Sequence, residues 1–379
     1  MFDCIVVGAG PAGATAAYHL AKRGHSVLVL EKAVLPRYKP CGGGVSPAIA
    51  QWFDFDFTPV INNTITRVQY TWQLSDPIAT DLQMKQPMWM VKRDEFDNYL
   101  IEQAKQKGAQ VKDSTEVKAI ALKNNSWQVT TAKETYQSSY LIAADGGRGS
   151  MVKWLGLKPR QESLGATLEV KTTIPVNKQH TAFFDFGTFK NGYIWNFPKA
   201  DGYSLSAGCM RGKAKSDELK RALIDYAKAS GIDLSDSHYN EYPLSVWTDN
   251  QTLHVNRAVI AGEAAGILDP LSGEGIRPSI FTGLKAAEAI DSAIAGDAQA
   301  LANYTQTISQ AWGSDMVLAN RLAGLFYQFP KIAYKVGVKR PAAAQIMAKI
   351  LCGEMRYSDV ADFAMQRLKK SLIPGLGRK

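Results

Sequence analysis

Mainly apolar residues form short continuous runs at four places along the chain. These runs lie at residues 2–7, 26–30, 140–144 and 258–261, and each ends at a glycine or an acidic residue. Runs of this length without alternation are typical of strands buried on both faces of a sheet. Residues 11–23, 93–107 and 279–294 instead carry apolar side chains at helical spacing, and Gly24 can end the first of these helices in a left-handed C-cap. The pattern predicts strand–helix units of an α/β fold.

Elsewhere, apolar and polar residues alternate, along residues 60–92 and 164–254. Segments such as 167–171 and 202–206 have the period of two that is typical of strands with one buried face. We therefore expect a nucleotide-binding α/β domain assembled from residues 1–59, 93–163 and 255–300. An antiparallel β-sheet domain of residues 60–92 and 164–254 would be interleaved with it, and residues 301–379 would form a helical C-terminal region.

The four cysteines of the 379-residue chain, at positions 4, 41, 209 and 352, are scattered and include no Cys-x-x-Cys pair. This spacing argues against a zinc site, an iron–sulfur cluster or a disulfide framework, so no metal is expected. It also fits a reducing compartment. A buried strand that begins at Phe2 would leave no room for a signal peptide, and no apolar run approaches the ~18 residues of a membrane span. We therefore expect a cytoplasmic protein.

Basic residues are concentrated near the C-terminus. Residues 321–379 hold twelve Lys or Arg and three acids, so this segment carries the whole formal net charge of +9. Such a segment can attract nucleic acid, an anionic membrane or an acidic protein. Its interleaved apolar residues, among them Leu322, Phe326, Ile346 and Ile350, resemble an interfacial helix more than a nucleic-acid arm. Helices packed on the main body with a solvated basic face fit the pattern equally well. No nucleic-acid partner is expected.

A glycine-rich turn follows the first strand. The motif Gly8-x-Gly10-x-x-Gly13 lies between a predicted strand and a predicted helix, and Glu31 ends the next strand 18 residues beyond Gly13. In this context the first glycine makes the turn, the second lets a pyrophosphate approach, and the third lets helix and strand pack closely. The helix N-terminus offers free N–H groups to phosphates, and Glu31 would bind the adenosine ribose hydroxyls. The sequence predicts a dinucleotide site.

Later segments distinguish FAD from NAD. Asp145-Gly146 resembles the Asp-Gly motif of the flavin-dependent aromatic hydroxylase superfamily, and Gly262-Glu263 resembles its Gly-Asp motif, with glutamate where the family usually has aspartate. Arg93 begins a segment that resembles the superfamily's arginine helix, which lies near FAD. The resemblance implies FAD as cofactor. It also implies an α/β fold with a Rossmann-like FAD-binding domain of the glutathione-reductase or aromatic-hydroxylase type, an interleaved antiparallel β-sheet substrate domain and a helical C-terminal region.

A second glycine loop, DPLSGEGIR at residues 269–277, precedes the helix predicted from Ser279. A glycine loop at a helix N-terminus suits the anionic N1–C2=O edge of reduced flavin. A turn without a ligand is the alternative. The residues expected to bind FAD are Gly8, Gly10, Ala12, Gly13, Glu31, Lys32, Cys41, Gly42, Gly43, Arg93, Asp145, Gly146, Gly262, Glu263, Gly273, Gly275 and Ile276.

Two further segments narrow the resemblance. KPCGGG at residues 39–44 follows the first strand–helix–strand unit, and YIWNFP at residues 193–198 lies in the alternating region. On a strand, Tyr193, Trp195 and Phe197 share one face, which can either fill a core or line a pocket. With GEAAG and DPLSGEGIR, these segments resemble the geranylgeranyl reductase family, in the family's order over most of residues 1–290.

That resemblance implies an FAD-dependent reductase that saturates isolated C=C bonds of a polyprenyl chain. Such a chain needs a long apolar tunnel, which stacked aromatic residues provide. Reduced flavin can deliver a hydride to one alkene carbon, and the other carbon needs a proton. Cys41 is the candidate catalytic residue as donor or relay of that proton, because a thiol is mostly protonated at neutral pH; a small pocket wall is its alternative role. The residues expected to bind substrate are Gly44, Tyr193, Trp195, Phe197 and Pro198.

The partners are less closely defined. No second dinucleotide fingerprint is present, so the reductant would be transiently bound NADPH or an acidic ferredoxin-like carrier attracted by the basic segment. The same segment could hold the enzyme peripherally at an anionic membrane, and we expect a monomer. The rival functions are an FAD-dependent monooxygenase or halogenase of the same superfamily and a non-catalytic lipid-binding flavoprotein. A membrane electron-transfer flavoprotein is disfavoured, since scattered cysteines cannot ligate an iron–sulfur cluster.

Overall fold

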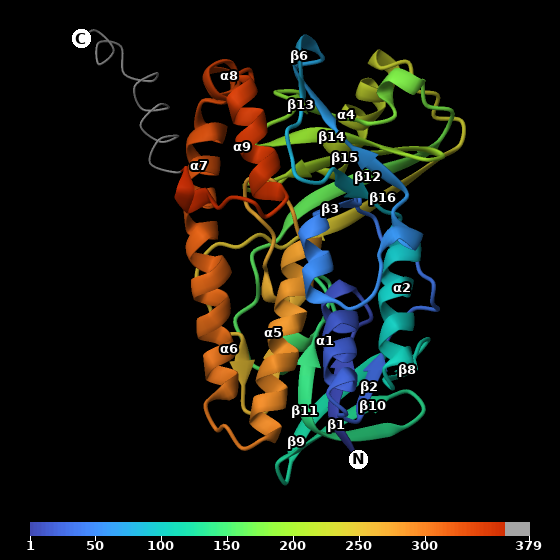
Figure 1. The fold of residues 1–379 in the computed structure, drawn as a ribbon, viewed down its shortest axis with the longest axis vertical. Helices are drawn as coiled ribbons and strands as arrows, with labels where there is room; N and C mark the ends of the chain where they lie inside the picture. Colours follow the sequence, from blue (N-terminus) through green and yellow to red (C-terminus); the bar gives the residue numbers. More distant parts are fainter. Residues whose placement is uncertain (361–379) are drawn as a thin grey trace, which may run out of the picture.

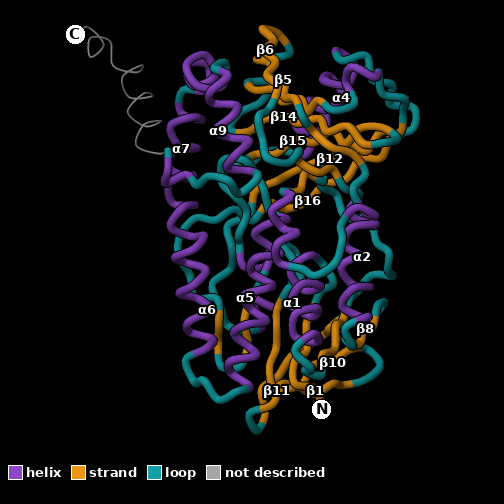
Figure 2. Tube along the Cα trace, in the orientation of Figure 1, coloured by secondary structure: helices purple, strands orange, loops and turns teal. Residues whose placement is uncertain are grey.

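Two large β-sheets lie at opposite ends of the molecule, and the long helices α1, α2, α5, α6 and α7 run lengthwise through the rest of it (Figures 1 and 2). The computed structural model describes residues 1–360. The last part of the basic segment, residues 361–379, therefore lies outside the described residues. The elements follow the expected α/β pattern, with the nucleotide-binding units around the first sheet and the alternating segments in the second.

The first sheet has a parallel core. Its strands follow the order β17-β18-β11-β1-β2-β8, with β10 paired to β11 and β9 paired to β10. The pairs β18–β11, β11–β1, β1–β2 and β2–β8 are all parallel. The strands are β1 (Phe2–Val7), β2 (Val27–Leu30), β8 (Gln110–Lys112), β9 (Val117–Lys123), β10 (Ser126–Thr131), β11 (Thr135–Ala143), β17 (His254–Val255) and β18 (Ala258–Ile260). The four apolar runs therefore lie in adjacent strands of this sheet.

The helix α1 is almost entirely buried because it packs between α2 and α5. A Cβ at Gly283 of α5 would lie 2.2 Å from the carbonyl oxygen of Ala12, so this helix pair approaches closely only without a side chain there. The helices in this half are α1 (Pro11–Lys22), α2 (Arg93–Gln106), α3 (Met151–Trp154) and α5 (Ile276–Ile294). The helix predicted from Ser279 begins earlier, at Ile276, because Pro278 is compatible with a first helical turn.

The second sheet is antiparallel except for one pair. Its order is β16-β12-β15-β14-β13-β5-β6, and β13 pairs with β5 in parallel. Alternation reports that one face of a strand is buried, but it carries no information about strand direction, so the parallel pair could not be predicted. The elements of this half are β5 (Arg67–Trp72), β6 (Ser75–Asp81), β12 (Ser163–Lys171), β13 (Thr181–Phe186), β14 (Gly192–Lys199), β15 (Gly202–Cys209), β16 (Ser237–Leu244) and the covering helix α4 (Ser216–Ala229).

A small third sheet lies between the two halves. It consists of β3 (Gly44–Val45), β7 (Met88–Met90) and β4 (Asn63–Ile65), with β7 in the centre. Residues 60–92 thus contribute strands to two sheets. Because β3 directly follows the first two glycines of KPCGGG, its pairing with β7 fixes the backbone of this loop against the second half of the molecule.

The C-terminal helices extend from the first sheet to the second. They are α6 (Ala300–Ile308), α7 (Ser314–Gln328), α8 (Pro330–Ala333) and α9 (Pro341–Leu351), with π-helical turns at Ser309–Gly313 and Tyr334–Val338. In Figure 1, α6 and α7 form a column along one side, and α8 and α9 lie beside the second sheet. Among the described residues, no helix is long and apolar enough to cross a membrane.

His19, in α1, makes the free energy of unfolding of the protein depend on pH. Its side chain is 7% exposed and packs against the rings of Tyr18 and Phe53. Burial, together with the charges of Arg23 and Lys22, lowers the pKa of His19 from 6.5 to about 4. Between these two values the unfolded chain binds a proton that the native protein does not. The free energy of unfolding therefore falls as the pH drops through this window, by roughly 3 kcal/mol in total.

Urea denaturation between pH 7 and pH 4 tests this expectation. His19→Gln, which does not titrate, should lose roughly 3 kcal/mol less stability over this range than the unsubstituted protein. If the two proteins lose the same amount, His19 is not the group responsible.

Candidate active site

The glycine turn after β1 is shaped by close backbone contacts. Gly8 has a φ of 103°, and a Cβ there would lie 2.3 Å from the carbonyl oxygen of Ala144. A Cβ at Gly13 would lie 1.9 Å from the carbonyl oxygen of Gly8. At Gly10, by contrast, the nearest atom to such a Cβ is Nη2 of Arg37, 3.6 Å away. The turn therefore leaves open space at Gly10, in front of the N-terminus of α1, where a phosphate can approach.

Two charged side chains border this space. Glu31, at the end of β2, is 4% exposed, and its Oε2 accepts a hydrogen bond from the N–H of Ala9 at 2.8 Å. The guanidinium of Arg37 lies 3.7 Å from Glu31 Oε2 through Nε and 3.2 Å from Asp97 Oδ2 through Nη1. Arg37 Nη1 is buried, and its contact with Asp97 is an ion pair without the geometry of a hydrogen bond. We did not identify Arg37 from the sequence, because its surroundings arise only when α2 brings Asp97 beside β2.

Asp145, after β11, has one bonded and one free carboxylate oxygen. Its Oδ2 accepts the N–H of Met151 at 2.9 Å, whereas its Oδ1 is buried without a partner in the described part of the chain. A Cβ at Gly149 would lie 1.9 Å from Oδ2, so backbone encloses the carboxylate. Burial raises the pKa of Asp145, and the N–H of Met151 partly offsets this. A buried acceptor without a partner calls for a donor, which a bound ligand can supply.

The segment after β18 approaches the same space from the other side. Gly262 has a φ of 67°, and a Cβ there would lie 2.7 Å from the Cβ of Ala12. Glu263 Oε2 lies 3.4 Å from Nζ of Lys39. Gly262, Glu263 and Ala12 all line one cavity with Lys32. The segment thus brings the carboxylate of Glu263 to the wall of this cavity, near Lys39 of the segment after β2.

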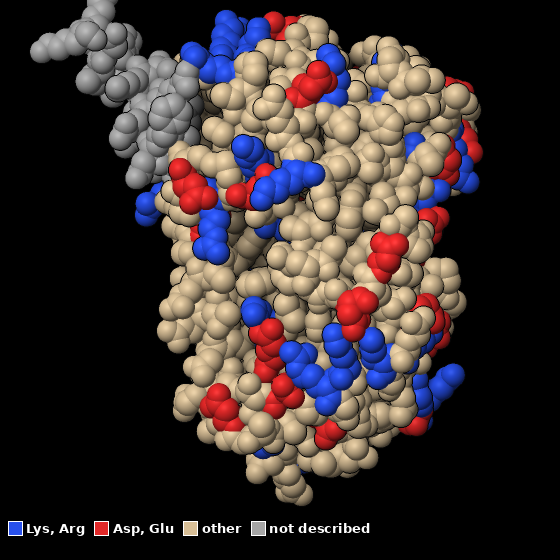
Figure 3. All heavy atoms as spheres, viewed as in Figure 1, with Lys and Arg blue, Asp and Glu red and all other residues tan. Residues whose placement is uncertain are grey.

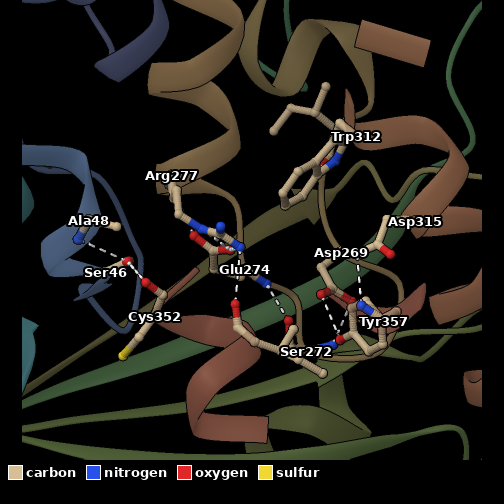
Figure 4. Close-up of polar contacts among 12 residues, drawn as sticks. Ser46, Ala48, Asp269, Ser272, Glu274, Arg277, Trp312, Asp315, Cys352 and Tyr357 are labelled. Carbon is tan, nitrogen blue, oxygen red and sulfur yellow. Dashed lines mark hydrogen bonds and ion pairs between the residues drawn. The ribbon is translucent and has the colours of Figure 1, made fainter. Parts of the chain in front are cut away.

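The second glycine loop is organised by Asp269, which is only 2% exposed (Figure 4). Its Oδ1 accepts the N–H groups of Leu271 and Ser272 at 2.8 and 3.0 Å, and its Oδ2 accepts the O–H of Tyr357 at 2.8 Å. Burial raises the pKa of Asp269, and these hydrogen bonds partly offset the shift. The residues after α9 are therefore bonded directly to the loop that is expected to face the flavin.

The end of α9 is held by two further contacts, also drawn in Figure 4. Arg277 pairs with Glu274, and its Nη2 donates to the carbonyl oxygen of Ile350 at 3.3 Å. Ser46, just after the KPCGGG loop, donates through Oγ to the carbonyl oxygen of Cys352 at 2.9 Å. Both glycine loops thus contact the C-terminal region, which lies far from them in sequence.

Arg93 begins α2 and lies next to Cys41. Its Nε and Nη2 each donate to the Asp97 carboxylate at 2.8 Å. Burial lowers the pKa of Arg93, but the charges of Asp97 and Cys41 raise it, and the net shift is upward. Arg93 therefore stays cationic beside the thiol.

The KPCGGG loop passes directly against the aromatic side chains of β14. A Cβ at Gly42 would lie 2.6 Å from Nε1 of Trp195 and 2.9 Å from Cδ2 of Phe197, and one at Gly44 would lie 3.4 Å from Phe197. Cys41 Sγ accepts the N–H of Gly43 at 3.4 Å, and the Cys41 side chain is partly exposed to the cavity. The glycines are needed because the loop backbone and the rings are in van der Waals contact.

Tyr193, Trp195 and Phe197 form one row on β14, as their alternation predicts. The rings of Tyr193 and Trp195 are 5.3 Å apart, and the O–H of Tyr193 donates to the carbonyl oxygen of Ser272 at 2.6 Å. The row lines a cavity of about 810 Å³. Pro198 alternates to the other face of the strand and does not line this cavity, although the sequence pattern had placed it with the substrate.

The structure brings most of the expected site residues together around this cavity. Gly13 also lies outside its wall, because its role is to let α1 pack on Gly8. The expected residues that line it are Gly8, Gly10, Ala12, Glu31, Lys32, Cys41, Gly42, Gly43, Gly44, Arg93, Asp145, Gly146, Tyr193, Trp195, Phe197, Gly262, Glu263, Gly273, Gly275 and Ile276.

The cavity has a polar arm at the glycine turn and an apolar arm beyond Cys41. The walls of the apolar arm come from β4, β5, β13 and the helices α7 to α9, and include Ile65, Val68, Tyr70, Phe184, Phe326, Ile346, Met347, Ile350 and Leu351. Leu322 of α7 and Ile350 of α9 are buried, so part of the apolar face of each helix packs on the main body. Phe329 and Ile332, each 39% exposed, are exceptions. The sequence did not assign these wall residues to the site, although their helical spacing was visible.

The polar arm fits FAD. The open space at Gly10 accommodates a pyrophosphate, Glu31 would bind ribose hydroxyls, and the buried Oδ1 of Asp145, without a partner among residues 1–360, offers an acceptor. Fold and site together define a flavoprotein with an α/β dinucleotide domain and a substrate cavity under a second sheet.

Comparison with known proteins agrees with this class. A family model described as "FAD binding domain" matches residues 1–311, so the chain belongs to this family and its cofactor is FAD. An uncharacterized protein of Methanosarcina barkeri is 33% identical over 299 residues, covering 77% of this chain and 75% of the relative. A digeranylgeranylglycerophospholipid reductase of Methanocaldococcus jannaschii is 28% identical, covering 78% of each chain.

Solved structures share the fold. A geranylgeranyl bacteriochlorophyll reductase-like protein from Thermoplasma acidophilum has a TM-score of 0.79 at 20% identity, over 99% of this chain and 97% of that one. A flavin-dependent halogenase, CmlS, has a TM-score of 0.66 at 22% identity, over 86% and 65% of the two chains. The resemblance to the geranylgeranyl reductases and the expected fold class are thereby confirmed, and the enzyme class is that of the FAD-dependent oxidoreductases.

Proposed function

We propose that this protein reduces C=C bonds of a polyprenyl chain with electrons from FAD. The observation that carries the proposal is the continuity of the cavity, in which the polar arm that fits FAD opens past Cys41 into an apolar arm lined by aromatic and aliphatic side chains. The apolar arm offers few hydrogen-bonding groups, which suits a hydrocarbon chain. Relatives named as reductases of geranylgeranyl compounds support the same activity.

Reduction of an isolated alkene adds a hydride to one carbon and a proton to the other. Bound reduced FAD supplies the hydride. The Cys41 thiol would donate the proton, so that its S–H bond breaks, a C–H bond forms, and the electron pair stays on sulfur. Arg93 would stabilise the resulting thiolate, which regains a proton from water. If Cys41 only lines the cavity, another donor must supply this proton.

The remaining site residues would position the chain and exclude water. Gly42 and Gly44 let the loop backbone lie against Trp195 and Phe197, and these two rings would hold the polyprenyl chain on the side of β14. The helices α7 and α9 close the apolar arm, so the reacting carbons would be shielded from solvent. Exclusion of water strengthens the electrostatic interactions within such a site.

The partners named from the sequence stay predictions: transiently bound NADPH or an acidic ferredoxin-like carrier as electron donor, an anionic membrane surface, and a monomeric state. Figure 3 shows Lys and Arg side chains gathered over α8 and α9. Phe329, just before α8, and Ile332, within it, are each partly exposed. Lys331 and Lys335 are exposed in the same segment. This combination supports a peripheral contact with anionic lipid.

The test is an anaerobic incubation of the chemically reduced holoenzyme with geranylgeranyl diphosphate, followed by mass spectrometry of the chain. We expect a gain of two hydrogens per reduced bond, together with reoxidation of the flavin. In a parallel incubation under air, substrate-stimulated oxygen consumption without such a gain would instead identify a monooxygenase or halogenase. Tight lipid binding with neither reaction would indicate a non-catalytic carrier.

A further inference from the structure

Lys199 is a buried cation behind the Cys41 loop. It ends β14, two residues beyond Phe197, so the alternation of the strand places it on the same face as the aromatic row. Its side chain is only 6% exposed. Its Nζ donates to the carbonyl oxygen of Gly42 at 2.6 Å and to that of Val91 at 2.9 Å. The ammonium therefore joins the loop to the end of the small third sheet.

The backbone of the loop is shaped around this ammonium. Gly43 has a φ of 73°, and a Cβ there would lie 2.5 Å from Lys199 Nζ and 2.1 Å from the carbonyl oxygen of Val91. The N–H of Val91 donates in turn to the carbonyl oxygen of Gly43 at 2.8 Å. The middle glycine of KPCGGG is thus needed to admit the lysine, whereas Gly42 and Gly44 admit the aromatic rings.

A second buried polar group supports the same loop. Ser204, opposite Phe197 in the sheet, has its Oγ 3.3 Å from the carbonyl oxygen of Cys41 and 3.0 Å from Oε1 of Glu169. Glu169 is the strongest attractive charge acting on Lys199. Burial raises the pKa of Glu169, and the charge of Lys199 partly offsets this. Two polar side chains of the second sheet, those of Ser204 and Lys199, therefore bind the consecutive carbonyl oxygens of Cys41 and Gly42.

We propose that Lys199 is a positioning residue that clamps the Cys41 loop against the aromatic row and stabilises the negative charge that Cys41 carries when it loses its proton. This inference rests on the proposed function for its catalytic consequence, but the electrostatic part applies to Cys41 whatever the substrate. The glycine motif and the aromatic motif do not by themselves predict this role of Lys199.

The charges around the two groups agree with this role. Burial lowers the pKa of Lys199 to about 8, against the raising effects of Glu169, Cys41 and Asp201, and Lys92 lowers it further. At neutral pH the lysine is therefore still mostly charged. The other titratable groups facing Cys41 are Arg93 of α2, Tyr38 of the preceding loop and Tyr242 of β16. Of these groups and Lys199, only the two cations can favour the thiolate.

The test measures alkylation of Cys41 by iodoacetamide from pH 6 to 10, in the oxidised holoenzyme without substrate. Cys4, Cys209 and Cys352 are at most 3% exposed, so Cys41 is the cysteine that a small reagent reaches, and mass spectrometry verifies the site. Because the thiolate is the reactive form and loss of a nearby cation disfavours it, Lys199→Met should slow alkylation of Cys41 at neutral pH. The rate at pH 7 would then fall about tenfold.

Two further variants separate charge from packing. Lys199→Arg keeps the charge and should retain the profile of the unsubstituted protein. Lys92→Met removes a partly exposed lysine that pairs with Asp201; because Lys199 keeps its charge at neutral pH, the profile should change far less than in Lys199→Met. If Lys199→Met does not fold, Lys199→Gln, which keeps one donor for the Gly42 carbonyl, replaces it. An unshifted profile in a folded neutral variant overturns the proposal.

The catalytic consequence is read separately. With geranylgeranyl diphosphate, Lys199→Met should lower kcat about tenfold or more. The change in KM should be much smaller, because Lys199 does not line the cavity that would hold the polyprenyl chain. A shifted alkylation profile in an enzyme without any reductase activity would leave the role of Lys199 intact and count against the proposed function. If the alkylation profile shifts but kcat is unchanged, proton donation by Cys41 does not limit the rate of alkene reduction, and the proposed effect of Lys199 on catalysis is wrong.

Discussion

Replacement of Cys41 by serine is expected to lower the rate of alkene reduction by about 10²- to 10⁴-fold, the range that a positioned general acid contributes. Serine can still accept the N–H of Gly43, so the loop should keep its conformation. A hydroxyl is a far weaker acid than a thiol, so the proton would no longer be supplied to the alkene. The measurement is a single-turnover reaction of reduced enzyme with geranylgeranyl diphosphate under anaerobic conditions.

The matched control is Cys209→Ser, the same chemical change at a buried cysteine that lies outside the cavity wall. It should leave the single-turnover rate within about twofold of the unsubstituted enzyme. Both variants should bind FAD and be reduced by dithionite as the unsubstituted enzyme is. If Cys41→Ser reduces the alkene at the full rate, the Cys41 thiol does not donate the proton and only lines the cavity.

The second large effect is expected at the dinucleotide turn, where two glycines differ in what surrounds them. Alanine at Gly13 would place a methyl group 1.9 Å from the carbonyl oxygen of Gly8, so α1 must move away from β1. Overpacking of this kind typically costs ~1–3 kcal/mol or more. Gly13→Ala should therefore lower the melting temperature of the apoprotein by on the order of 5–10 °C, and FAD binding should be lost with the geometry of the turn.

Alanine at Gly10 should separate cofactor binding from folding. Gly10 has a φ of −76°, which alanine adopts without strain, and its Cβ would meet only the end of the Arg37 side chain at 3.6 Å. The apoprotein should therefore melt like the unsubstituted one. The methyl group would occupy the space that a pyrophosphate needs, so the Kd for FAD should rise at least tenfold, or about 1.4 kcal/mol. Fluorescence titration of the apoprotein measures it. Unaltered FAD affinity in Gly10→Ala would mean that the cofactor phosphates do not pass this glycine.

Part of the site could be predicted from local sequence because local geometry determines it. The glycine turn, the carboxylate at the end of β2 and the aromatic row on β14 each depend on residues a few positions apart, through the sharp turn, the buried strand or the period of two. Pro198 shows the limit of this reasoning, because it belongs to the same motif but alternates away from the cavity.

The sequence by itself determined the class of fold, the cofactor and the motifs that meet at it, since these follow from short-range periodicity and from glycines that a close backbone approach requires. Only the tertiary structure decided which distant groups complete the site. Arg37 meets Asp97 of α2, Lys199 meets the carbonyl oxygen of Gly42, and α9 closes the apolar arm through the contacts of Arg277. Each of these contacts joins residues between 60 and 157 positions apart. Such contacts depend on how whole elements pack, and no local pattern of apolar and polar residues encodes that packing.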